Sequence, residues 1–174
     1  MQSKVKFLGH PVHPMLTSFP IAFFTATLLC SIVYVSTHNV FWFKVEFIAN
    51  CAGLITAAAA MLPGLIDWLV IPMAREAKVT GMKHMLANVF SVALFAANAG
   101  VSYSYYASPN PPYQYGVLLS SFGFLIMLYA GFMGWKMVQT HHIGVDNSSK
   151  EAVDEVEEKK TGMSAFTKFR EQKN

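Results

Sequence analysis

The sequence has little charge. Only 13% of its 174 residues are Asp, Glu, Lys or Arg, whereas 53% are hydrophobic, and soluble domains average about 25% charged residues. More than half of the charged residues lie in the last stretch, residues 146–174. This composition excludes an ordinary soluble domain and indicates a membrane protein. The lack of a basic run interleaved with aromatic residues also excludes a nucleic-acid-binding face.

Cysteine is equally scarce, and motifs of common enzymes are missing. Cys30 and Cys51 both lie in apolar segments, so they form neither a CxxC metal site nor a disulfide framework. The sequence has no Gly-x-Ser-x-Gly elbow, no P-loop and no dinucleotide-binding fingerprint. No internal repeat is visible either. No hydrolytic site is therefore visible, and enzymatic activity stays an open question, with a non-hydrolytic redox protein as one candidate.

Long apolar segments are what the sequence does have. A membrane-spanning helix needs about 20 mostly apolar residues. Four segments reach that length: residues 15–37, 43–71, 84–106 and 115–138. We therefore predict an all-α, polytopic membrane protein with four transmembrane helices in an up-down bundle. The predicted organisation is an N-terminal segment with the HPxHP motif (1–14), a transmembrane domain (15–145) and a charged, disordered cytoplasmic tail (146–174).

The positions of Lys and Arg predict how the bundle is oriented. All but one of the basic residues before the tail fall on the side of the two termini and the second connection: Lys4, Lys6, Arg75, Lys78, Lys83 and Lys136. Only Lys44 falls on the opposite side. The positive-inside rule then places both termini in the cytoplasm. The sequence predicts a multi-pass protein of the cell inner (plasma) membrane.

Two His-Pro pairs precede the first predicted span, in the stretch GHPVHPM at residues 9–15. A residue before proline is pushed towards extended or polyproline II conformation. Polyproline II repeats every three residues, so the pattern predicts that His10 and His13 present their imidazoles on one side of a stiff strand. Pro14 is then suited to start the helix that follows.

Histidines from distant parts of the chain are predicted to meet at the cytoplasmic face. His84 opens the third span and Asn88 follows at helical spacing, in a polar stripe that must face the bundle interior. Asp67 ends a stripe of small residues in the second span, and His141 follows the fourth. We therefore predict one pocket lined by six residues: His10, His13, Asp67, His84, Asn88 and His141.

The chemistry of this pocket leaves several functions open. Several imidazoles with one carboxylate suit iron, copper or zinc, with five candidate ligands: His10, His13, Asp67, His84 and His141. Paired histidines can instead hold a haem b iron axially, and the candidates are then His10, His13, His84 and His141. In both cases the site is linked to redox chemistry or electron transfer. Asn88 is expected to contact the ligand side chains without binding the metal or haem itself.

Two other functional classes remain. One is a small-solute or ion transporter, or an accessory subunit of one, that uses Asp67 and His84 as a polar or proton path. Because four spans make a thin transporter, that hypothesis favours a homo-oligomer. The other is a membrane scaffold. Each histidine also has an ordinary explanation as an interfacial hydrogen-bonding group.

Four stretches resemble the domain of unknown function 2231 family, which comprises bacterial predicted membrane proteins with four helices. In order over about residues 9–145, they are GHPVHPMLTSFPIAFF, GLIDWLVIP, KHMLANVFSVALFAAN and THHIGV. The resemblance implies that the six predicted pocket residues stand at the family's signature positions. Trp135 and His142 depart from the glycines that the family's final segment would have. Association of relatives with Rieske-type or cytochrome c domains implies electron transfer with a membrane redox partner.

Overall fold

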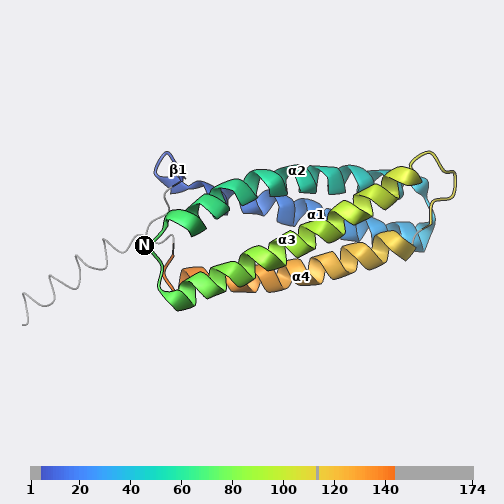
Figure 1. Cartoon of the computed structure of the whole chain (residues 1–174). Coiled ribbons are helices and arrows are strands. Elements are labelled where there is room, and N and C mark those ends of the chain that lie inside the picture. Colours follow the sequence, from blue (N-terminus) through green and yellow to red (C-terminus); the bar gives the residue numbers. More distant parts are fainter. Residues whose placement is uncertain (1–4, 113, 144–174) are drawn as a thin grey trace, which may run out of the picture.

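The computed structural model describes residues 5–112 and 114–143 as a bundle of long helices (Figure 1). The helices α1 and α3 run in one direction and α2 and α4 in the other. The elements are β1 (Lys6–Phe7), β2 (His10–Pro11), α1 (Val12–Thr37), α2 (Val40–Val70), α3 (Arg75–Ser104) and α4 (Gln114–Gln139). The predicted all-α fold with four helices is confirmed. The predicted tail, 146–174, lies outside the described residues.

Each of the four helices is long enough and apolar enough to cross a membrane. The shortest have 26 residues, which at 1.5 Å per residue exceeds the roughly 30 Å of a bilayer's hydrocarbon core. Large apolar side chains point outwards along the bundle, for example Leu29, Ile55 and Leu125, which are 57%, 71% and 60% exposed. Such an exterior suits contact with lipid rather than with water.

The HPVHP segment differs from its prediction. Leu8 and Gly9 have positive φ angles of 50° and 82°, and they form the tight turn of the hairpin in which β1 and β2 pair. Because α1 begins directly after β2, His13 lies in the first helical turn and not in a polyproline strand with His10. Pro14 is tolerated there because first-turn amides have no acceptor within the helix.

The third helix begins earlier than its predicted span. α3 starts at Arg75, nine residues before His84, so His84 lies in the third turn of the helix and does not open it. The added turns are polar on their exposed side, where Arg75 lies, but they bury Ala77 and Thr80. Apolar content alone therefore could not locate the helix start.

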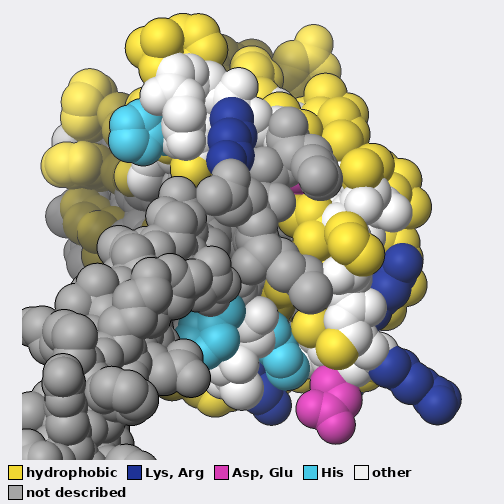
Figure 2. Space-filling view, turned by 90° about the vertical axis from the view of Figure 1, so that its left-hand side faces the viewer, with side chains coloured by type: hydrophobic (Ala, Val, Ile, Leu, Met, Phe, Trp, Pro, Cys, Tyr) yellow, Lys and Arg dark blue, Asp and Glu magenta, His cyan; other side chains and the backbone are white. Residues whose placement is uncertain are grey.

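The two ends of the bundle differ in charge. We call the end with the β1–β2 hairpin and the α2–α3 connection the histidine end, and the end with the α1–α2 and α3–α4 connections the glutamate end. Figure 2 shows the histidine end, with Lys, Arg and His side chains around it. Exposed Lys6, Arg75 and Lys83 belong to this end, whereas Lys44 lies in the first turns of α2 at the glutamate end.

The two helical hairpins repeat each other, contrary to the expectation of no internal repeat. α1 packs chiefly on α2, and α3 chiefly on α4. His84 lies 71 residues after His13, and Phe95 lies 71 residues after Phe24. Since α1 and α3 run in the same direction, this is a parallel repeat, of the kind related by an axis along the membrane normal.

Close contacts in the core follow the same repeat. A Cβ added at Gly53 of α2 would lie 2.6 Å from the Phe24 ring, and one added at Gly123 of α4 would lie 2.8 Å from the Phe95 ring. Gly123 follows Gly53 by 70 residues. The two phenylalanines then stack on each other in the buried core, with ring centroids 3.9 Å apart. The core of the bundle therefore lies where the two hairpins meet.

Candidate functional site

His13 and His84 meet in the half of the bundle nearest the histidine end. Their ring centroids are 6.2 Å apart and the ring planes are nearly perpendicular, at 88°. Both side chains are partly buried. They come from α1 and α3, at equivalent positions of the repeat. Of the predicted pocket, this is the pair that the fold brings together.

Each imidazole is oriented by a backbone carbonyl of its own hairpin. His13 Nδ1 lies 2.7 Å from the Ala60 carbonyl, and His84 Nδ1 lies 2.8 Å from the Ala130 carbonyl. A carbonyl oxygen only accepts, so each ring donates through Nδ1–H, and a neutral ring then keeps a lone pair on Nε2. Metal-ligating histidines commonly use their second nitrogen in this way.

Asn88 is the third member of this site. Its Nδ2 lies 3.1 Å from Nε2 of His84 and 2.9 Å from the backbone carbonyl of the same residue, one turn earlier. The amide nitrogen also lies 3.4 Å from Nδ1 of the same ring, so it sits over the imidazole between its two nitrogens and does not point along the Nε2 lone pair. The hydrogen bond to the His84 carbonyl therefore holds the Asn88 side chain against the imidazole and leaves the Nε2 lone pair free for a ligand.

Two glycines allow the histidine rings to lie against the neighbouring helices. A Cβ added at Gly64 would lie 2.7 Å from the His13 ring, and one added at Gly134 would lie 3.1 Å from the His84 ring. Each glycine follows the accepting alanine by one helical turn. The glycines therefore let each ring reach the carbonyl that orients it.

The remaining predicted ligands make other contacts. His10 is exposed in β2, paired with Phe7. Asp67 is partly buried, and its Oδ1 accepts a hydrogen bond of 3.3 Å from the Val5 amide. In the described residues, no group of three or more His, Cys, Asp or Glu side chains is placed to hold a metal ion.

His141 lines a separate groove on the surface of the histidine end. Its Nε2 lies 3.3 Å from Thr80 Oγ1. The groove is open, has a volume of about 410 Å³, and lies between the start of α3 and the end of α4; its lining residues are Arg75, Glu76, Val79, Thr80, Lys136, Thr140 and His141. His141 therefore faces this groove.

A second buried polar site, which sequence reasoning did not single out, surrounds Glu46. This side chain is only 2% exposed and accepts hydrogen bonds from Asn98 Nδ2 at 2.7 Å and from Ser102 Oγ at 3.2 Å. The signal in the sequence was an acidic residue inside an apolar segment. Such residues are expensive in a membrane and usually functional.

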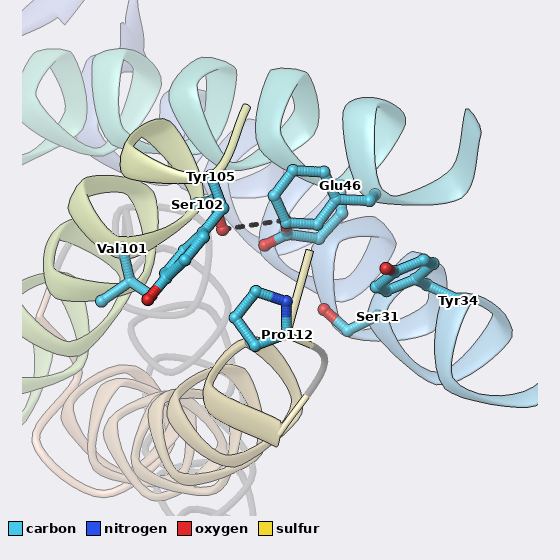
Figure 3. Close-up of a pocket in the computed structure, with 9 residues that line it drawn as sticks. Ser31, Tyr34, Glu46, Val101, Ser102, Tyr105 and Pro112 are labelled. Carbon is cyan, nitrogen blue, oxygen red and sulfur yellow. Dashed lines mark hydrogen bonds between the residues drawn. The ribbon is translucent and has the colours of Figure 1, made fainter. Parts of the chain in front are cut away.

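A small cavity lies beside Glu46 (Figure 3). Its volume of about 10 Å³ is close to the least that holds one water molecule. In the described part of the chain, Ser31 Oγ and Asn98 Oδ1 are buried without a hydrogen-bond partner. The cavity is lined by Ser31, Tyr34, Phe43, Glu46, Val101, Ser102, Tyr105, Pro112 and Gly116.

Comparison with known proteins agrees with the membrane fold. The sequence model of the family described as "Predicted membrane protein (DUF2231)" matches residues 9–147. The matched range includes all four helices and confirms the resemblance seen in the sequence motifs. No curated protein and no solved structure matches the chain.

Proposed function

The chain belongs to the DUF2231 family of predicted membrane proteins, and from that premise we propose that it is an electron-transfer protein whose haem b iron is held by His13 and His84. The observation that carries the proposal is the pair of imidazoles, 6.2 Å apart between ring centroids, each oriented through Nδ1 by a backbone carbonyl. A haem iron has two axial positions, and histidine is a common occupant of both.

The donor set suits a haem iron better than a bare ion. Zinc and related ions bound by protein take three or four protein ligands. Two imidazoles do not reach that number, and in the described residues no larger group of metal-ligating side chains is placed around them. A porphyrin supplies four nitrogens of its own, so two histidines complete its iron. A bare iron, copper or zinc ion would need further ligands from His10, Asp67 or His141.

The chain's own residues would do three things for the cofactor. Ala60 and Ala130 keep both Nε2 lone pairs available by accepting from Nδ1. The stacked phenylalanines, eleven residues further along the same two helices, would bound the cofactor on the side of the bundle centre. The two hairpins contact each other less than the helices within each hairpin do, so a flat macrocycle has its easiest access between them. Bound haem supplies a one-electron couple.

The distribution of charge supports a cytoplasmic position for this site. Basic side chains gather at the histidine end, and such residues favour the cytoplasmic side of an inner membrane. The proposed topology therefore has the α2–α3 connection in the cytoplasm and the two other connections outside. Electrons would enter or leave at the cytoplasmic leaflet, through a membrane redox partner.

Transport is the second candidate, and the internal repeat favours it. Several transporter folds are built from parallel repeats with the substrate site between them, and His13 and His84 occupy such a position here. In this alternative His84 and Asp67 belong to a polar or proton path. The chain would then move a solute without binding haem.

The test is the colour of the purified full chain, expressed with an adequate supply of haem. We expect a Soret band with about one haem per chain, weakened in His13→Ala and in His84→Ala. His10→Ala and His141→Ala serve as matched controls and should keep it. A colourless wild-type protein that also lacks stoichiometric metal contradicts this proposal and favours transport.

A further inference from the structure

The buried site at the glutamate end lies where the repeat is broken. Gly116 of α4 is the counterpart of Glu46 of α2, 70 residues later. Four other lining residues form two pairs that are identical in both hairpins. Ser102 follows Ser31 by 71 residues, and Tyr105 follows Tyr34 by 71 residues. Glu46 and its counterpart Gly116 line the same cavity, one with an acidic side chain and the other with none.

The charge of Glu46 needs compensation. The hydrogen bonds that its carboxylate accepts come from neutral donors, the Asn98 amide and the Ser102 hydroxyl. A buried carboxylate is strongly destabilising unless it is paired or neutralised. In an apolar bundle, either a proton or a bound cation must supply the missing positive charge.

Two further oxygen atoms lie close to Gly116, one of the residues that line the cavity. A Cβ added at Gly116 would lie 3.7 Å from Asn98 Oδ1 and 3.8 Å from Ser31 Oγ. Both oxygens are buried and lack a hydrogen-bond partner in the described residues, and both residues are more than nine-tenths buried. Figure 3 shows Ser31 and Ser102 approaching Glu46 from different helices. A buried polar atom without a partner needs an explanation, and a bound water molecule or ion is one of them.

We propose that Glu46, Asn98 and Ser31 bind one small monovalent cation of the size of sodium. Hard cations prefer oxygen ligands, and these three residues offer a carboxylate, an amide oxygen and a hydroxyl. A single carboxylate balances a single positive charge, whereas a divalent ion would leave a net charge in the membrane. A proton would neutralise Glu46, but Asn98 Oδ1 would then need a separate partner such as a water molecule, whereas one cation serves both groups.

The cation reaches this site from the glutamate end. Glu46 lies six residues after the first residue of α2, a depth of roughly 9 Å along the helix. Tyr34 donates a 2.7 Å hydrogen bond to the Pro111 carbonyl, which holds the α3–α4 connection over the cavity. Tyr105, which also lines the cavity, is 40% exposed and marks the side open to the solution.

Sodium binding to the full chain in detergent tests the proposal. Choline chloride keeps the ionic strength constant while the concentration of NaCl is raised. We expect the thermal unfolding temperature to rise with the sodium concentration and to reach a plateau. Radioactive sodium should bind to about one site per chain. Unfolding that responds to pH but not to sodium would show that a proton occupies the site and would overturn the proposal. The haem measurement is separate, because it concerns the other end of the bundle.

Variants localise the effect. Glu46→Gln keeps the size of the side chain but removes its charge, so both the sodium-dependent shift and sodium binding should disappear. Gly116→Ala places a methyl group in the cavity at ordinary contact distances and should weaken sodium binding at least tenfold. Gly131→Ala is the matched control, because it lies in the same helix with no neighbour near its added Cβ. Unchanged sodium binding in Gly116→Ala would contradict the site.

Discussion

Phe24 and Phe95 stack face to face in the middle of the bundle, with ring centroids 3.9 Å apart and planes within 9°. They occupy equivalent positions of the two hairpins, and both are almost fully buried. His13 and His84 lie on the same two helices towards one end, and Glu46 lies towards the other. The phenylalanine pair thus separates two polar sites of different chemistry within one membrane domain.

We predict that this pair contributes strongly to stability. Removing a buried phenylalanine ring typically costs about 3–5 kcal/mol, so Phe24→Ala and Phe95→Ala should each lower the free energy of unfolding in detergent by about that amount. Phe122→Ala is the control, because its side chain is 59% exposed, and it should cost much less. Equal losses in the three variants would mean that the stack is not part of the core.

The glycines beside the histidines should be sensitive to even one methyl group. Gly64→Ala would bring a Cβ within 2.7 Å of the His13 ring, a distance that forces the ring away from the Ala60 carbonyl. Loss of such an orienting contact commonly costs 10–100-fold in metal affinity, and we expect haem affinity to fall by about that factor.

The equivalent change on the other hairpin should be milder. Gly134→Ala would place its Cβ 3.1 Å from the His84 ring, so a shift of a few tenths of an ångström relieves it, and haem affinity should fall less than in Gly64→Ala. Haem titration of both variants measures the difference. The reverse order would mean that the two rings are not held as described.

Tyr34 and Tyr105 form a second matched pair. Tyr34 is 6% exposed and donates a hydrogen bond to the Pro111 carbonyl. Tyr34→Phe should therefore lower the free energy of unfolding by about 1 kcal/mol, and the loss is larger where the carbonyl finds no other donor. Tyr105→Phe, at a partly exposed position, should change it little. Chemical denaturation of both variants decides whether this hydrogen bond holds the α3–α4 connection.

Single cysteines can test the proposed orientation. In a chain with Cys30 and Cys51 replaced by Ala, Thr37→Cys at the α1–α2 connection should react with a membrane-impermeant maleimide in intact cells. Ala74→Cys at the α2–α3 connection should react only after the membrane is permeabilised. The opposite pattern would place the histidine end outside and would contradict the positive-inside argument.

The sequence predicted the fold because apolar length is a strong signal in membrane proteins. It predicted the helix starts less well. The polar first turns of α3 resemble a loop in composition, and Pro14 suggested an extended segment although a helix accepts proline in its first turn. The turn at Leu8 and Gly9 has one glycine as its only cue.

The candidate site was predicted in part. His13, His84 and Asn88 lie together as expected, because their positions on α1 and α3 fix which way they face. Asp67 and His141 lie at the same end, but helical spacing alone cannot tell which neighbour each side chain contacts. The repeat is not evident from the sequence, because it is carried by contacts between a few residues, such as His13 with Gly64, rather than by a continuous stretch of identity. Glu46 has one cue in the sequence, its acidic side chain inside an apolar segment, and its burial shows the importance of that cue.

Electron paramagnetic resonance of the oxidised, haem-loaded full chain tests the central claim most directly. Two imidazoles on one ferric iron give a low-spin spectrum, and we expect that spectrum in the wild-type protein and its conversion to high spin in His13→Ala and in His84→Ala. A high-spin wild-type spectrum, or a low-spin spectrum that survives both substitutions, would show that these two histidines do not hold the iron.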